Sequence, residues 1–107
     1  MLEKVEKEYI RKAAQAAGYP LGVWNGEFKG YWLQREKRYF NPFREDADAF
    51  RLQIDLGIRL AIDKKKNEAY ASHTQLPIGV YQYGMDYRYA ARHAITCVAA
   101  LLRGRAS

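Results

Sequence analysis

A helix with signals at both ends occupies most of residues 41–57 and limits how the rest of this chain can fold. Pro42 lacks an amide hydrogen and fixes its own φ, so it marks a change of direction before the helix. Asp46 and Asp48 place negative charge at the positive end of the helix dipole, and we expect the helix to begin near Asp46. Gly57 favours the left-handed conformation that commonly follows a last helical turn, so the helix should end there.

The side-chain pattern of this helix predicts which of its faces is buried. Asp48, Arg51 and Asp55 recur at i, i+3 and i+7, and we expect them on the solvated side. The apolar side chains should form a broad surface that faces the core: Ala49, Phe50, Leu52, Ile54 and Leu56. The helix would then anchor the segments on either side of it.

Two further helices are expected near the two ends of the sequence. Apolar residues at helical spacing and acid-first i, i+4 charge pairs predict a helix over residues 2–17, ended by Gly18. Asp86 is expected to cap a final helix that runs to about Leu102, with Gly104 closing it.

The remaining segments favour strands. Residues 21–40 are rich in aromatic and β-favouring side chains and predict two or three short antiparallel strands, with Asn25-Gly26 as a type I′ hairpin turn. Residues 58–63 alternate between apolar and polar, and residues 68–72 return after a charged turn, which predicts a second hairpin. Residues 75–85 contain proline and glycine among apolar side chains, and we expect a packed loop.

Together these elements predict an α+β fold in a single domain over residues 1–107. We expect one antiparallel sheet of about four to five strands with helices on one face, in the order α-β-β-(β)-α-β-β-α. The other face of such a sheet would be partly exposed, and its aromatic side chains would then be available for binding.

Charge and cysteine content narrow the class of protein. The formal net charge of +6 favours polyanionic partners or simple solubility. Cys97 is the only cysteine, so no intramolecular disulfide can form. Neither a signal-type apolar segment nor a membrane-spanning segment is visible in the sequence, and we expect a cytoplasmic protein.

Three short motifs carry a family resemblance. They are Phe40-Asn41-Pro42, the acidic pair Glu45-Asp46 that leads into residues 47–52, and Ala-Ala-Arg-His-Ala-Ile at residues 90–95. In this combination the chain resembles a family of small uncharacterised proteins of tailed phages and prophages, akin to the NinX-like group. Phe40 stands where that family carries tryptophan, and His93 stands where it carries arginine. The resemblance implies a phage or prophage origin and an accessory role, and it supplies no catalytic residues.

Two groups of basic residues are candidates for nucleic-acid contact. Arg88, Arg92 and Arg103 share the outer side of the expected last helix, where they would either follow a phosphate backbone or form an ordinary solvated face. The second candidate combines basic residues at hairpin turns with aromatic side chains on which bases could stack: Arg35, Lys37, Arg38 and Lys64 to Lys66. The alternative is that these aromatics belong to the core.

No constellation of residues indicates catalysis or a cofactor. His93 and Cys97 are one helical turn apart, which suits two ligands of a metal, with His73 as a third candidate. A zinc site needs a fuller ligand set, so Cys97 is interpreted as a small buried residue, and we expect no metal, no cofactor and no enzymatic activity.

The preferred hypothesis is a non-enzymatic protein-interaction module. Tyr81 and Tyr83, in the expected loop, are the candidate residues for binding a protein partner. The alternative is a small basic nucleic-acid-binding protein that uses the arginines of the last helix and exposed aromatics. A homodimer is also expected if a single-layer sheet leaves apolar area to cover.

Overall fold

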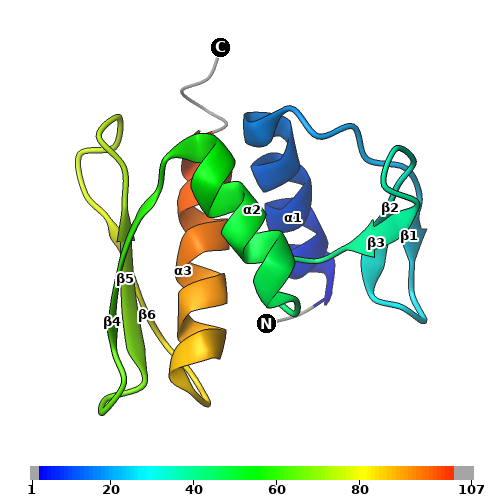
Figure 1. The fold of residues 1–107 in the computed structure, drawn as a ribbon. Helices are drawn as coiled ribbons and strands as arrows, with labels where there is room; N and C mark the ends of the chain where they lie inside the picture. The colour runs from blue at the N-terminus through cyan, green and yellow to red at the C-terminus, as the bar shows by residue number, and fades with distance from the viewer. Residues whose placement is uncertain (1–2, 103–107) are drawn as a thin grey trace.

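The computed structural model describes residues 3–102, which form three helices and six strands (Figure 1). In chain order the elements are α1 (Glu3–Ala17), β1 (Trp24–Asn25), β2 (Gly30–Leu33), β3 (Arg38–Phe40), α2 (Asp46–Leu56), β4 (Arg59–Asp63), β5 (Glu68–Ser72), β6 (Val80–Tyr83) and α3 (Tyr87–Leu102). Every strand pairing in this part of the chain is antiparallel. The prediction of an α+β fold with antiparallel strands is therefore confirmed.

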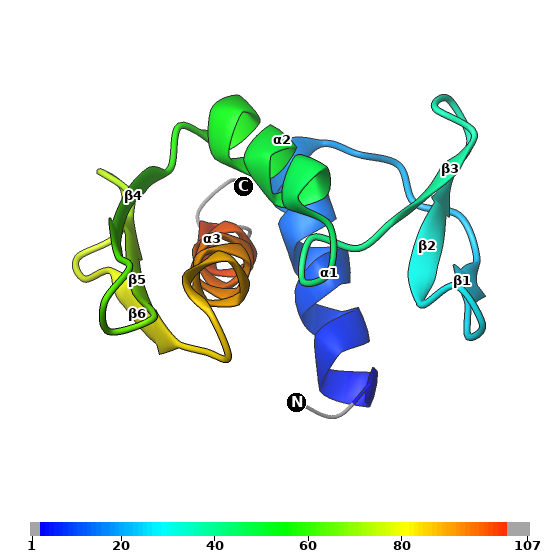
Figure 2. The ribbon, with the colours of Figure 1, turned by 60° about the horizontal axis from the view of Figure 1, so that its bottom comes forward.

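The six strands form two sheets, which corrects the expectation of one sheet of about four to five strands. Sheet A has the order β1-β2-β3 and sheet B the order β4-β5-β6. The two sheets lie on opposite flanks of the molecule with the helices between them (Figure 2). Each sheet is a meander that is followed by a helix, so the shared plan of the two halves is preserved while their sheets remain separate.

Small side chains allow α3 to lie at the centre of this arrangement. It packs against α1 and α2 and against the inner face of sheet B (Figure 2). Ala69 and Ala71 are the buried residues of β5, and Ala13 and Ala14 are buried on α1. Because alanine lets backbones approach closely, α3 is enclosed on several sides and buries most of its length.

The helix ends agree with the sequence signals inside the described range. Gly18 and Gly57 both adopt positive φ, at 78° and 69°, just after α1 and α2. The Asp86 side chain accepts the Tyr89 N–H at 2.7 Å and so caps α3. Gly104, expected to close the last helix, lies outside the described residues.

The predicted orientation of α2 is wrong at three of its residues. Asp48, expected in solvent, is fully buried, while Phe50 and Ile54, expected in the core, are 59% and 60% exposed. The Asp48 carboxylate accepts the Asn41 N–H at 2.9 Å and pairs with Arg38 at 2.6 Å. These partners compensate the carboxylate for lost hydration, so α2 turns its Asp48 side inward.

Two local predictions are also corrected. The expected loop over residues 75–85 contains strand β6, because the edge of β5 provides backbone partners that the sequence pattern does not reveal. Asn25-Gly26 does not form a two-residue turn. Instead the Asn25 side chain accepts the N–H groups of Glu27 and Phe28, and Lys29 supplies the positive φ.

Candidate functional site

The outer face of sheet B carries a row of exposed tyrosines. The strand register places Tyr70 of β5 opposite Tyr81 of β6, and Tyr83 follows two residues later on the same face. The ring centroids lie 5.8 Å apart between Tyr70 and Tyr81 and 5.6 Å apart between Tyr81 and Tyr83. Their exposed fractions are 39%, 52% and 66% in the order Tyr70, Tyr81, Tyr83. We call these three residues the tyrosine face.

Local contacts order the tyrosine face. The Tyr81 hydroxyl donates to the Glu68 carboxylate at 2.8 Å, and this hydrogen bond raises the pKa of Tyr81. A Cβ on Gly79 would lie 2.5 Å from the Tyr70 ring, so the absence of a side chain at Gly79 lets that ring lie against the backbone. The rings are therefore held in place before any partner arrives.

A basic turn lies at one end of the tyrosine face. The β4–β5 turn carries three exposed lysines, Lys64, Lys65 and Lys66. The turn runs from Asp63 to Glu68, and Glu68 is paired with Tyr83 of β6. Asp63 Oδ1 accepts the N–H groups of Lys65 and Lys66, which fixes the turn. The ammonium group of Lys64 lies 5.4 Å from the centroid of the Tyr87 ring. Lys64 therefore lies near the start of α3, and the turn as a whole places positive charge at the Tyr83 end of sheet B.

The arginines predicted on α3 do not form a free stripe within the described residues. Arg88 is exposed. Arg92 donates from Nε to the Phe43 carbonyl at 2.8 Å and from Nη1 to Asp46 at 2.7 Å, so it ties α3 to the start of α2. Arg103 lies outside the described residues.

The basic residues predicted at the β2–β3 turn lie in sheet A, on the flank opposite sheet B (Figure 1). Arg35 and Lys37 are exposed there. Arg38 is the partner of the buried Asp48. The structure therefore separates this turn from the lysines of the β4–β5 turn and brings the two groups to no common surface.

His93 and Cys97 have different environments although they are one helical turn apart. Burial raises the pKa of Cys97 to about 11, and its sulfur lies 3.9 Å from the Gln82 side-chain nitrogen. Burial, followed by the neighbouring Arg92, lowers the pKa of His93 to about 4. Both side chains are uncharged at neutral pH.

His73 has a structural role in the described part of the chain. Its Nε2 bonds the Leu56 carbonyl at 2.8 Å, and its Nδ1 accepts the Gln75 N–H at 3.0 Å. The ring thereby satisfies a free carbonyl at the end of α2. Among residues 3–102, no group of three or more His, Cys, Asp or Glu side chains is placed to hold a metal ion.

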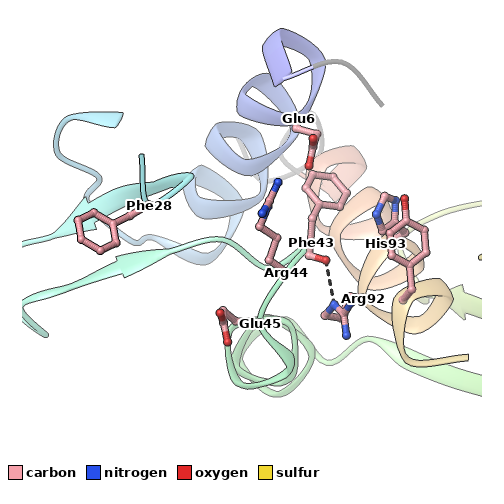
Figure 3. Close-up of a pocket in the computed structure, with 8 residues that line it drawn as sticks. Glu6, Phe28, Phe43, Arg44, Glu45, Arg92 and His93 are labelled. Carbon is pink, nitrogen blue, oxygen red and sulfur yellow. Dashed lines mark hydrogen bonds between the residues drawn. The ribbon is translucent and has the colours of Figure 1, made fainter. Parts of the chain in front are cut away.

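Sequence reasoning missed a hollow that contains His93. It has a volume of about 610 Å³ and is lined from α1, sheet A, the turn before α2 and α3 (Figure 3). The His93 ring lies between two aromatic rings, 4.5 Å from the Phe43 centroid and 4.1 Å from that of Tyr89. Only the i, i+4 spacing of Tyr89 and His93 is visible in the sequence, because Phe43 belongs to a distant segment.

Comparison with known proteins does not assign the chain to a group. No protein-family model, curated protein or solved structure matches this chain.

None of the helices in the described range is both long and apolar enough to cross a membrane.

Proposed function

We propose that this chain is a non-enzymatic interaction module that binds an acidic partner protein through the tyrosine face. Following the resemblance noted in the sequence, we also propose that it is an accessory protein of a phage or prophage. The observation that carries the binding proposal is the row of three exposed, mutually contacting tyrosines on a sheet whose other face is covered by α3.

The side chains of the tyrosine face suit protein recognition. Tyrosine is enriched at protein interfaces because it buries a large area, fixes only two side-chain torsions and offers a hydroxyl for hydrogen bonding. Tyr81 is already held by Glu68, so less side-chain freedom is lost when a partner binds. A flat aromatic centre of this kind is the expected position of the residues that dominate affinity.

The charge around the tyrosine face favours an acidic partner. The β4–β5 turn, which carries three lysines, ends at Glu68, the residue paired with Tyr83, and the whole chain carries a net charge of +6. Complementary charge accelerates association and orients the two proteins, and it weakens as salt is added. We therefore expect the partner to present carboxylates around an apolar centre.

The environments of His93 and Cys97 support binding rather than catalysis. A thiol nucleophile requires a depressed pKa, whereas burial raises that of Cys97 to about 11. His93 is neutral and contacts aromatic rings instead of the thiol. Neither side chain activates the other as a nucleophile and base would.

The test compares two double variants that remove similar exposed apolar area. Tyr81→Ala with Tyr83→Ala should weaken binding of the partner captured from a bacterial host by about 30-fold or more, the loss typical of dominant interface residues. Phe50→Ala with Ile54→Ala, on the exposed side of α2, is the matched control and should leave affinity within about twofold. Both should melt within a few degrees of the parent chain.

Charge reversal at Lys65 and Lys66 tests the second half of the proposal. Lys65→Glu with Lys66→Glu should weaken binding and reduce its dependence on salt. Equal loss of binding in both double-alanine variants, or unchanged binding after removal of Tyr81 and Tyr83, would remove the tyrosine face as the docking surface.

A further inference from the structure

The starting point is a buried imidazole without a hydrogen-bond partner. His93 is 5% exposed, and neither ring nitrogen makes a hydrogen bond with any residue in the range 3–102. The ring nitrogens are not among the fully buried side-chain atoms without a hydrogen bond in residues 3–102, which are Trp24 Nε1 and Asp48 Oδ1, so they are accessible from the hollow. The ring borders the 610 Å³ hollow, so a polar group placed in that space could pair with it.

The hollow at His93 continues toward sheet A. A second hollow of about 170 Å³ shares Phe28, Arg44 and Glu45 with the first and is also lined by Tyr39. Figure 3 shows Arg44 between Phe28 on one side and Phe43 and His93 on the other. We call the two connected hollows the His93 groove.

An aromatic stack forms the sheet A end of the His93 groove. The Phe28 and Tyr39 rings are nearly parallel, at 11°, with their centroids 5.0 Å apart. The Phe28 backbone N–H is held by the Asn25 side chain at 2.9 Å, and the Phe28 side chain remains 64% exposed. The open side of Phe28 can therefore accept a third planar ring, as stacking platforms for bases do.

An exposed cation, whose charge also contributes to lowering the pKa of Glu3, lies in the middle of the His93 groove. The Arg44 guanidinium is exposed and makes no ion pair or hydrogen bond with the described residues. Arg92, nearby, is already bonded to Phe43 and Asp46. Arg44 is thus the group available to bind a phosphate, since a planar guanidinium matches phosphate oxygens with two parallel donors.

We propose that the His93 groove binds a nucleotide unit, with the base on Phe28, the phosphate at Arg44 and a phosphate oxygen directed toward His93. This site lies apart from the tyrosine face and is independent of the proposed protein partner. Neutral His93 keeps one N–H donor, which suits a phosphate oxygen that extends past Arg44.

Two carboxylates in the His93 groove further narrow the class of ligand that it would bind. Glu6 and Glu45 line it and oppose the charge of any phosphate, so inorganic phosphate, which has no ring to stack on Phe28, should bind poorly. The same carboxylates can accept hydrogen bonds from an amino group on a base. Adenine should therefore bind better than uracil.

The experiment titrates the full chain with AMP, UMP, inorganic phosphate and a short single-stranded oligoadenylate at low salt, with the ring ¹⁵N signals of His93 as the readout. AMP or the oligomer should shift these signals. Phe28→Ala and Arg44→Gln should each weaken binding by about tenfold or more, because each removes one of the two main contacts. Val23→Ala and Arg59→Gln, exposed positions outside the groove, are the controls and should bind as the parent chain does.

The outcomes distinguish a free nucleotide from a nucleotide that belongs to a single-stranded nucleic acid. Binding of AMP and the oligomer supports a free nucleotide site, and binding of the oligomer alone supports a single-stranded nucleic acid. Absence of any His93 shift with both ligands overturns the proposal. Inorganic phosphate that binds as tightly as AMP also overturns the proposal, because the stack on Phe28 would then contribute nothing. So does an equal loss of affinity in the control variants, because the groove residues would then have no special role.

Discussion

Asp48 shows how a single residue fixes the orientation of α2. Its carboxylate is buried, and it connects Arg38 of β3 with the backbone N–H of Asn41. Asp48→Ala should lower the free energy of unfolding by about 2–4 kcal/mol, because the Asn41 N–H is left buried without an acceptor and Arg38 loses its partner. Urea denaturation measures this change. Glu27→Ala, an exposed acid, should change stability by less than about 0.5 kcal/mol, and an equal effect of the two substitutions would contradict the role of Asp48.

His93 makes stability depend on pH. Its pKa is about 4 in the folded chain and near 6.5 in its unperturbed state, so between these values the unfolded chain binds more protons than the folded one. The contribution of His93 to the free energy of unfolding should therefore be at its maximum above about pH 6.5. It should fall by up to roughly 3 kcal/mol as the pH drops toward 4.

The check is a series of denaturation curves between pH 5 and pH 7, a window that lies above the lowered pKa values of Glu3 and Glu36. His93→Gln should flatten the slope in this window, because glutamine does not titrate. A slope that persists in the variant would assign the pH dependence to another group.

At the scale of elements, three of the four hairpin connections in residues 3–102 follow one pattern. Each loop has four residues, and its last residue has a positive φ between 53° and 55°. These positions hold Lys29, Lys37 and Asn67. The left-handed conformation is strained for lysine and free of strain for glycine.

Lys37→Gly should therefore stabilise the chain by about 0.5–1 kcal/mol, because relief of strain exceeds the added freedom of the unfolded chain. Lys65→Gly is the matched control, since Lys65 occupies a turn with ordinary φ, and it should be neutral or destabilising. Thermal melting compares the two variants. A loss of stability in Lys37→Gly would contradict the strain argument.

The elements also show what the sequence could predict. Helix ends at Gly18, Gly57 and Asp86 were predictable because they depend on local backbone conformation and capping. The face of α2 was not, because burial of Asp48 depends on Arg38, whose position is set by sheet A. Strand β6 was missed because its pairing depends on β5 and not on its own composition.

The sequence likewise predicted only part of the candidate sites. Tyr81 and Tyr83 are exposed as expected, although they lie on a strand and not in a loop, and their contact with Tyr70 required the register of β5 and β6. The His93 groove could not be found in the sequence. It forms only where Phe28, the turn before α2 and α3 meet.

At the scale of the whole molecule, the helical layer keeps two candidate surfaces apart. The tyrosine face belongs to sheet B on one flank, and the His93 groove lies between α3, α1 and sheet A (Figures 1 and 3). Because α3 separates them, a partner on the tyrosine face does not cover the groove. The two binding events should therefore be independent, with affinities that change by less than about twofold when the other site is filled.

The central claim is that the tyrosine face docks the partner protein, and the most direct measurement is NMR of the chain labelled with ¹³C in its tyrosine rings. Addition of the captured partner should shift or broaden the ring signals of Tyr70, Tyr81 and Tyr83 and leave those of Tyr31 and Tyr39 in sheet A unchanged. Shifts confined to the sheet A tyrosines, with no change in the three rings of sheet B, would contradict the claim.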